Sequence, residues 1–239
     1  MRSFLAVFVL LTLAGPSLGA VLVDRGLPTA NLNNTAGGNR SNVAWAFGAT
    51  WATGDDFAVS SASEISTIRV WSVGGSTSNL AMYLYNEATS AWTTYNNYTV
   101  TPTTYSGGST YQGSSGSYIS IYQLDFAVGI TAAAGTKFDF AVLGDTSVNT
   151  FLHASNASLS GSTQEGSDNL FYSLDTTNLT GLTGWESCDS NQPGVWDKSS
   201  DINVQVLGTV VPEPATCIVW SLFGGIGVFA GWRRRRLAA

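Results

Sequence analysis

Hydrophobic residues recur at every second position in short runs along this chain, and clusters of Gly, Ser, Thr and Asn separate the runs. A period of two places successive side chains on opposite faces of a β-strand, whereas a helix needs a period near 3.6. In the run ISTIRVWSV, for example, Ile68 and Val70 share one face, while Arg69 and Trp71 share the other. The pattern predicts strands within residues 43–47, 55–59, 65–73, 80–86, 117–128, 136–144, 169–174 and 201–208.

Residues 21–210 are therefore expected to form one all-β domain. Many short strands with polar loops of uneven length favour an antiparallel two-sheet β-sandwich of the jelly-roll kind over a small barrel or a propeller. No repeat of blade length is visible, and a β-helix, the structural competitor, would need a short regular period. The inward faces are expected to include Leu80, Met82, Leu84, Phe138, Phe140, Val142, Ile202, Val204 and Val206.

The first 20 residues have the three parts of an export signal. Arg2 supplies a short positive region, FLAVFVLLTLA supplies an apolar core, and GPSLGA supplies a helix break and small residues for cleavage. We expect residues 1–20 to be a signal peptide that is cleaved near Gly19 or Ala20. An uncleaved anchor is the alternative.

The C-terminal residues 211–239 predict a second membrane signal. Residues 215–232 are uncharged, and as a helix rising about 1.5 Å per residue they would be just long enough for one transmembrane helix. A basic cluster that stops transfer and stays on the cytoplasmic side follows directly, in the form of Arg233, Arg234, Arg235 and Arg236.

Two prolines hold the segment before this predicted helix in an extended conformation, because each ring fixes φ and disfavours helix in the preceding residue. The segment is Val211, Pro212, Glu213 and Pro214. It is either a rigid spacer or a processing site that a membrane enzyme reads as an extended peptide. The order of motif, apolar span and terminal arginines resembles the PEP-CTERM sorting signal of exopolysaccharide-producing bacteria.

That resemblance implies a partner and a location. In the family, an exosortase-type membrane enzyme acts at the Pro-Glu-Pro motif, and the substrate passes from the inner membrane to the cell-envelope surface or the extracellular matrix. The body is also similar to the choice-of-anchor-type domains on such proteins, through GDDFAVSSASEISTIRVWSV, NLAMYLYN and AGTKFDFAVLG. This second resemblance implies a β-sandwich and a location, and it assigns no chemistry.

The body is strongly acidic, which excludes one class of partner. Residues 21–210 hold nearly all of the 16 acidic side chains but only five of the ten basic ones. Nucleic acid is not expected to bind, because binding requires a basic surface that displaces counterions from phosphate groups.

Few residues suit catalysis, so we expect no enzyme and no cofactor. Asp55 and Asp56 are adjacent, and neighbouring strand residues point to opposite faces, so they should satisfy loop amides or hold a structural ion instead of forming the carboxylate pair of a glycan hydrolase. His153 is the only histidine, and Cys188 lacks the company of a thiol catalyst. A structural calcium ion could bind Asp189, Asp197 and Asp201.

Aromatic residues offer the remaining candidate chemistry, since exposed rings stack on sugar faces. Trp71, Phe138 and Phe140 are expected in the core, whereas the tyrosines of the polar stretch 92–117 are expected to be exposed; these are Tyr95, Tyr98, Tyr105 and Tyr111. The sequence thus favours a non-catalytic surface or matrix protein associated with exopolysaccharide or adhesion. A carbohydrate- or calcium-binding lectin-like module is the alternative, and a secreted glycan hydrolase is the weakest one.

Overall fold

The body of the chain is described by a computed structural model as strands joined by turns. The described residues are 19–27, 46–47, 52–73, 76–103, 110–112, 118–144, 150–156, 171–173, 186–187, 200–211, 233 and 236. Residues 1–18, 212–214 and 215–232 lie outside them, so the signal peptide, the Pro-Glu-Pro motif and the transmembrane helix stay predictions. Within the described ranges, no helix is long and apolar enough to cross a bilayer.

The described strands form an all-β fold with two antiparallel sheets, as the alternation predicts. The larger sheet runs in the order β1, β16, β4, β11, β2, with β9 also beside β4, and with β7 and β8 beside β9. Its strands are β1 (Ala20–Asp24), β2 (Ala46–Phe47), β4 (Ser63–Val73), β7 (Tyr98–Pro102), β8 (Thr110–Gln112), β9 (Tyr118–Ala132), β11 (Thr150–Leu152) and β16 (Val204–Val210).

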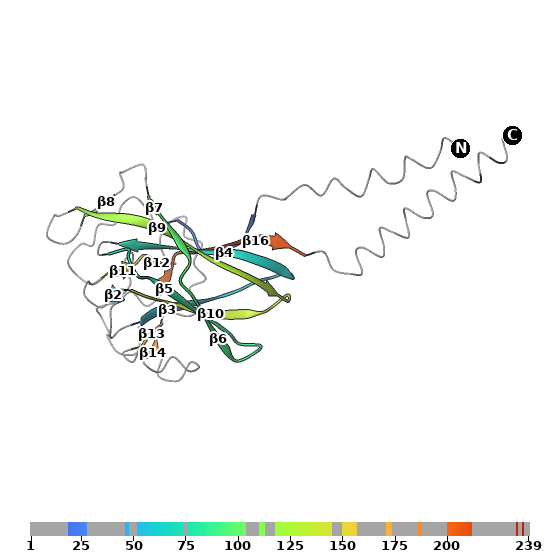
Figure 1. Ribbon diagram of the computed structural model, residues 1–239, viewed down its shortest axis with the longest axis horizontal. Coiled ribbons are helices and arrows are strands. Elements are labelled where there is room, and N and C mark those ends of the chain that lie inside the picture. The colour runs from blue at the N-terminus through green and yellow to red at the C-terminus, as the bar shows by residue number, and fades with distance from the viewer. Residues whose placement is uncertain are drawn as a thin grey trace.

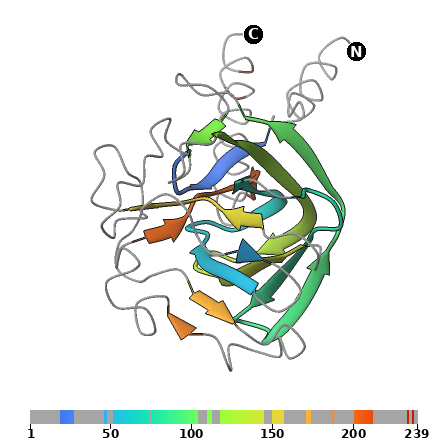
Figure 2. The ribbon, with the colours of Figure 1, turned by 90° about the vertical axis from the view of Figure 1, so that its left-hand side faces the viewer.

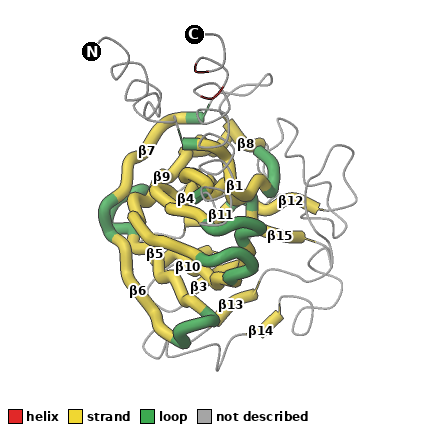
Figure 3. The backbone as a smooth tube through the Cα atoms, turned by 90° about the vertical axis from the view of Figure 1, so that its right-hand side faces the viewer, coloured by secondary structure: helices red, strands yellow, loops and turns green. Residues whose placement is uncertain are grey.

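The second sheet runs in the order β14, β13, β3, β10, β5, β6. Its strands are β3 (Ala52–Ala58), β5 (Ala81–Asn86), β6 (Ala91–Tyr95), β10 (Lys137–Leu143), β13 (Phe171–Ser173) and β14 (Glu186–Ser187), and a separate two-stranded ribbon joins β12 (Ala154–Asn156) to β15 (Ser200–Ile202). Figure 1 shows the sandwich from the side, Figure 2 shows it from one end, and Figure 3 shows, from the other end, β9, β4 and β1 above β5, β10 and β3.

The core lies between the two sheets and is built from alternate residues of their strands. Phe57 stacks on Phe138 with a ring-centroid distance of 5.3 Å, and Phe140 lies beside Phe57 at 6.2 Å. Burying a side chain of this size contributes about 1.5–3 kcal/mol relative to leaving it exposed. All nine predicted inward residues, from Leu80 to Val206, are buried, as is Trp71, so the predicted core faces are confirmed.

The chain changes pairing partners at two strand breaks that lie next to each other and form a corner of the sandwich. The chain from β11 to β12 breaks at His153, and the chain from β15 to β16 breaks at Asn203, so the predicted single strand 201–208 is two strands. The two breaks face each other: Asn203 N donates to His153 O at 3.0 Å, and His153 N donates to Trp71 O at 2.8 Å. The ribbon of β12 and β15 thereby leaves the larger sheet, and the amide of Ile202 donates to the Asp55 carboxylate of β3.

Candidate functional site

The two ends of the body meet at one end of the sandwich. Strand β1 pairs antiparallel with β16, so that Ala20 lies opposite Gly208. Beyond that pairing, Val210 lies opposite Ser63 of β4, and Val211 N donates to Ala62 O at 2.8 Å. The predicted signal-peptide junction and the first residue of the predicted sorting motif therefore lie at the same end, to the right in Figure 1.

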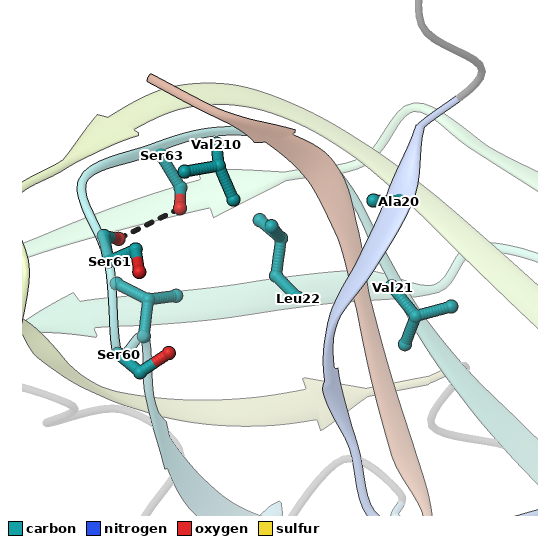
Figure 4. Close-up of a pocket in the computed structure, with 8 residues that line it drawn as sticks. Ala20, Val21, Leu22, Ser60, Ser61, Ser63 and Val210 are labelled. Carbon is teal, nitrogen blue, oxygen red and sulfur yellow. Dashed lines mark hydrogen bonds between the residues drawn. The ribbon is translucent and has the colours of Figure 1, made fainter. Parts of the chain in front are cut away.

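A pocket of about 200 Å³ opens beside this pair of strands. Its lining is made of small apolar and hydroxyl side chains, with Ala20, Val21 and Leu22 from β1, Ser60 and Ser61 from the loop after β3, and Ser63 from the start of β4 (Figure 4). Ser63 donates from its Oγ to the carbonyl of Ser61 at 2.8 Å. None of its eight lining residues carries a carboxylate, an imidazole or an amine.

Gly208 allows β16 to lie this close to β4 and β1. A Cβ atom at this position would overlap the carbonyl oxygen of Glu64 and would come within 2.9 Å of Leu22 Cδ1. The pairing register of β16 shifts between Leu207 and Gly208, which is the mark of a β-bulge. The glycine thus positions the last residues of the body where the tail begins.

A buried ionic cluster follows β1 directly and ties it to the second sheet. Arg25 is 2% exposed, and its guanidinium lies 3.2 Å from Asp55 Oδ1, 3.0 Å from Asp56 Oδ1 and 3.9 Å from Asp201 Oδ2. Strand β13 pairs with β3 only as far as Gly54, and Arg25 reaches β3 just beyond that point. One guanidinium therefore holds carboxylates from two strands.

Backbone amides complete the environment of Asp55. Its Oδ2 accepts from Ile202 N at 2.6 Å, and its Oδ1 accepts from Asp56 N at 2.8 Å. Burial raises the pKa of Asp55 well above its ordinary value, and the charge of Arg25 opposes that rise. Asp55 thus accepts from amides, as predicted, although these amides belong to strands and not to loops. Both carboxylates also reach the same guanidinium, although neighbouring strand residues were expected to point to opposite faces.

The polar groups of the corner belong to the same network. Asn203 Nδ2 donates to the carbonyl of Arg25 at 3.0 Å, and its Oδ1 lies 2.7 Å from His153 Nδ1. His153 is fully buried, and burial lowers its pKa to about 4. A neutral histidine locked to an amide holds the corner together, which fits the expectation of an ordinary loop or strand residue.

A second charged group lies on the outer face of the smaller sheet. Lys137 Nζ is 2.6 Å from Asp56 Oδ2 and 3.6 Å from Glu87 Oε1. Asp139 lies opposite Asp56 in the β10–β3 register and is 2% exposed. Burial first, and then the charge of Glu87, raise the pKa of Asp139 to about 7.

The predicted calcium ligands are only partly covered by the structure. Asp201 is buried beside Arg25, whereas Asp189 and Asp197 lie outside the described residues. In the part of the chain that the structure describes, no group of three or more His, Cys, Asp or Glu side chains is placed to hold a metal ion. A calcium site stays a prediction.

The predicted exposure of the tyrosines is wrong for two of them. Tyr95 and Tyr98 are half-buried and pack against the core, and the Tyr98 ring lies 5.2 Å from Phe126. The Tyr98 hydroxyl also donates to Thr77 O at 2.8 Å. Tyr105 lies outside the described residues, and for Tyr111 only the backbone of β8 is described. Strand pairing of β7 with β9 covers Tyr98, and local composition does not reveal such pairing.

Other aromatic residues occupy the outer face of the smaller sheet. Tyr85 of β5 lies opposite Trp92 of β6, and their rings are 5.1 Å apart. Tyr83 shares their face, because Met82 and Leu84 alternate with it and point into the core. All three aromatic residues are half-buried.

Comparison with protein-family models, with curated proteins and with solved structures gave no match.

Proposed function

We propose that the protein is an exported, non-catalytic cell-surface or extracellular-matrix protein that is sorted through its C-terminal tail. The tail would comprise the motif 211–214, a transmembrane helix over 215–232 and the arginines 233–236, and an exosortase-type enzyme would process it. The body would be a β-sandwich of the jelly-roll kind. The observation that carries the proposal is the position of Val211, which is hydrogen-bonded to the end of the sandwich beside the start of β1.

This position is the one expected if both predicted membrane signals are attached to the same end of a folded domain. Strand β16 ends before the predicted sorting motif, and β1 overlaps the predicted signal peptide only at Ala20, so processing at either end would leave nearly all of the pairing of β1 and β16 in place. The carboxylates of Asp55 and Asp56 are engaged by Arg25, Lys137 and backbone amides, which is the arrangement of a structural network. These features support a role in which the body is displayed.

Ending the chain after Val211 is expected to leave a folded body that the cell envelope no longer retains. The truncation keeps the hydrogen bond from Val211 N to Ala62 O, so stability should change by less than about 0.5 kcal/mol. Fractionation of producing cells, with thermal unfolding of the purified body, measures both effects. A truncated body that stays with the envelope would contradict the proposal.

Processing itself is tested by intact-mass spectrometry of protein recovered from the cell surface. The natural chain should give a mass that ends within residues 211–214, and the double variant Pro212→Ala, Pro214→Ala should retain 233–236. Thr209→Ala, a partly buried position in β16, is the matched control and should be processed normally.

Glycan binding is a second candidate function, and the ring pair of Tyr85 and Trp92 favours it. Neighbouring aromatic rings on an outer sheet face can stack on successive sugar rings. We expect Trp92→Ala to lower binding to an array of neutral polysaccharides about tenfold, while Thr94→Ala on the same strand leaves it unchanged. Equal polysaccharide binding by the natural chain and both variants would show that the aromatic face does not bind glycans.

A further inference from the structure

We propose that the end of the sandwich around Val21, Val210 and Val211 is a membrane-contact surface, held in the interfacial layer of the bilayer that carries the tail. This inference rests on the proposed function, because it requires residues 215–232 to be inserted. The surface consists of those three valines, the loop 60–62 and the turn 133–135.

The length of chain between body and bilayer sets how far apart they can lie. Val211 is fixed to Ala62, and the predicted span begins at Ala215, four residues later. Four fully extended residues reach about 14 Å at most. The headgroup layer on each side of the hydrocarbon core is about 5–8 Å thick. The end of the body must therefore lie in or directly above the headgroups for as long as the tail is inserted.

The side chains at this end fit such a layer. Val21, Val210 and Val211 are 49%, 53% and 37% exposed, and they are three of the five large apolar residues that are exposed within the described ranges. The polar–apolar boundary of a bilayer would cover Val210 and Val211 at the end of β16 and Val21 on the neighbouring strand β1.

Most of the remaining described residues of this end carry no charge, and the exposed Glu64, opposite Thr209, is the exception. Loop 60–62 is Ser-Ser-Ala, and it joins Val211 through the carbonyl of Ala62. Turn 133–135 is Ala-Ala-Gly, is exposed, and is hydrogen-bonded to the same region through Gly135 N and Val59 O at 2.8 Å. The carboxylate of Glu64 would repel anionic headgroups, so the contact should favour zwitterionic lipid.

The pocket beside β1 is part of this surface. Leu22, Val59 and three serines are among its lining residues (Figure 4). A lining of apolar and hydroxyl side chains suits the boundary between acyl chains and ester groups. This chemistry favours lipid over a charged protein surface as the occupant.

Depth-dependent fluorescence quenching tests the contact in the full chain. Cys188 and Cys217 are replaced by serine, a bimane probe is attached at Val210→Cys or Val21→Cys, and the protein is reconstituted in phosphatidylcholine vesicles with a shallow nitroxide lipid. Val100→Cys is the matched control, since Val100 is 37% exposed. Val100 lies opposite Leu124 of β9, whereas Ser63, at the proposed surface, lies opposite Ala132 of the same strand. These two positions on β9 are eight residues apart, or about 26 Å, so the control lies far from the surface.

Probes at Val210 and Val21 should be quenched at least threefold more than the probe at Val100. Val210→Ser should lower the quenching of the probe at Val21, whereas Val100→Ser should not; both are exposed sites where serine leaves the fold intact. Equal quenching at Val210 and Val100 would overturn the inference, as would quenching that needs the processing enzyme in the vesicles.

A carbonate wash of the same vesicles separates this failure from failure of the proposed function. Chains that stay in the membrane but show no preferential quenching would overturn only the contact surface. Chains that wash off completely would overturn the tail anchor, and the contact surface with it.

Discussion

Substituting Arg25 by alanine is expected to destabilise the body by about 3–5 kcal/mol, because it leaves buried carboxylates without their counter-charge. Asp55 and Asp201 are 1% and 0% exposed, so water cannot replace the guanidinium. The loss of stability should be largest at neutral and alkaline pH. There the buried carboxylates either stay ionised without a counter-charge or take up a proton from a solution that holds few, and both states cost free energy. Since Arg25 follows β1 directly, the variant should also release β1 from the sandwich.

Arg69 supplies a matched control for this prediction. It makes a two-pronged pair with Asp125, at 2.7 and 2.9 Å, but its side chain is 24% exposed. Water can solvate the partner after Arg69→Ala, so we expect a loss of about 1 kcal/mol or less. Urea unfolding of the mature chain at pH 7 compares the two variants. Similar losses for both would show that burial does not set the contribution of Arg25.

Hydrogen exchange distinguishes loss of the ion pair from loss of β1. Arg25→Lys keeps one charge but lacks the planar fork that reaches Asp55 and Asp56 together. We expect it to retain part of the stability and to leave the amides of β1 protected. In Arg25→Ala, amides of β1 should exchange faster than those of β10.

The core of this fold could be predicted from sequence because strand geometry is local. Alternation alone identifies the inward faces of β5, β10 and β16, and each is confirmed by burial of residues such as Met82, Phe140 and Val204. Even Trp71, which the alternation places on the face opposite Val70, is buried.

Strand partners could not be predicted in the same way, because pairing joins residues far apart in the chain. The polar, tyrosine-rich stretch that contains β6 and β7 has few aliphatic residues, and nothing within it shows that β7 lies beside β9. Strand β1 begins at Ala20, where the predicted signal peptide ends, so its apolar residues are easily assigned to the signal.

The ionic cluster shows the same division between local and long-range information. That Asp55 satisfies amides follows from its place on a strand, whereas its partner Arg25 lies 30 residues earlier. The available signal was the scarcity of bases: each of the five bases in so acidic a body is well placed to be a counter-charge. Because the paired residues are far apart in the sequence, the sequence does not show which carboxylates Arg25 pairs with.

Replacing Asp139 by asparagine is expected to stabilise the body at alkaline pH by about 1–3 kcal/mol. Burial, helped by Glu87, raises the pKa of Asp139 to about 7, from an ordinary value near 3.8. The folded chain therefore binds more protons than the unfolded chain between about pH 4 and pH 7. The free energy of unfolding falls as the pH rises through this window, and asparagine removes that fall.

His153 acts in the opposite direction and gives the experiment an internal check. The pKa of His153 is about 4 in the folded chain, against an ordinary value of 6.5. The unfolded chain therefore binds more protons than the folded chain between these two pH values. The free energy of unfolding thus falls as the pH drops from 6.5 to 4. Urea unfolding from pH 4 to 8 should show Asp139→Asn gaining on the natural chain only as the pH rises. His153→Gln should flatten the acid side alone. A constant difference between Asp139→Asn and the natural chain across this range would mean that Asp139 does not titrate there, and that Lys137 holds it ionised throughout.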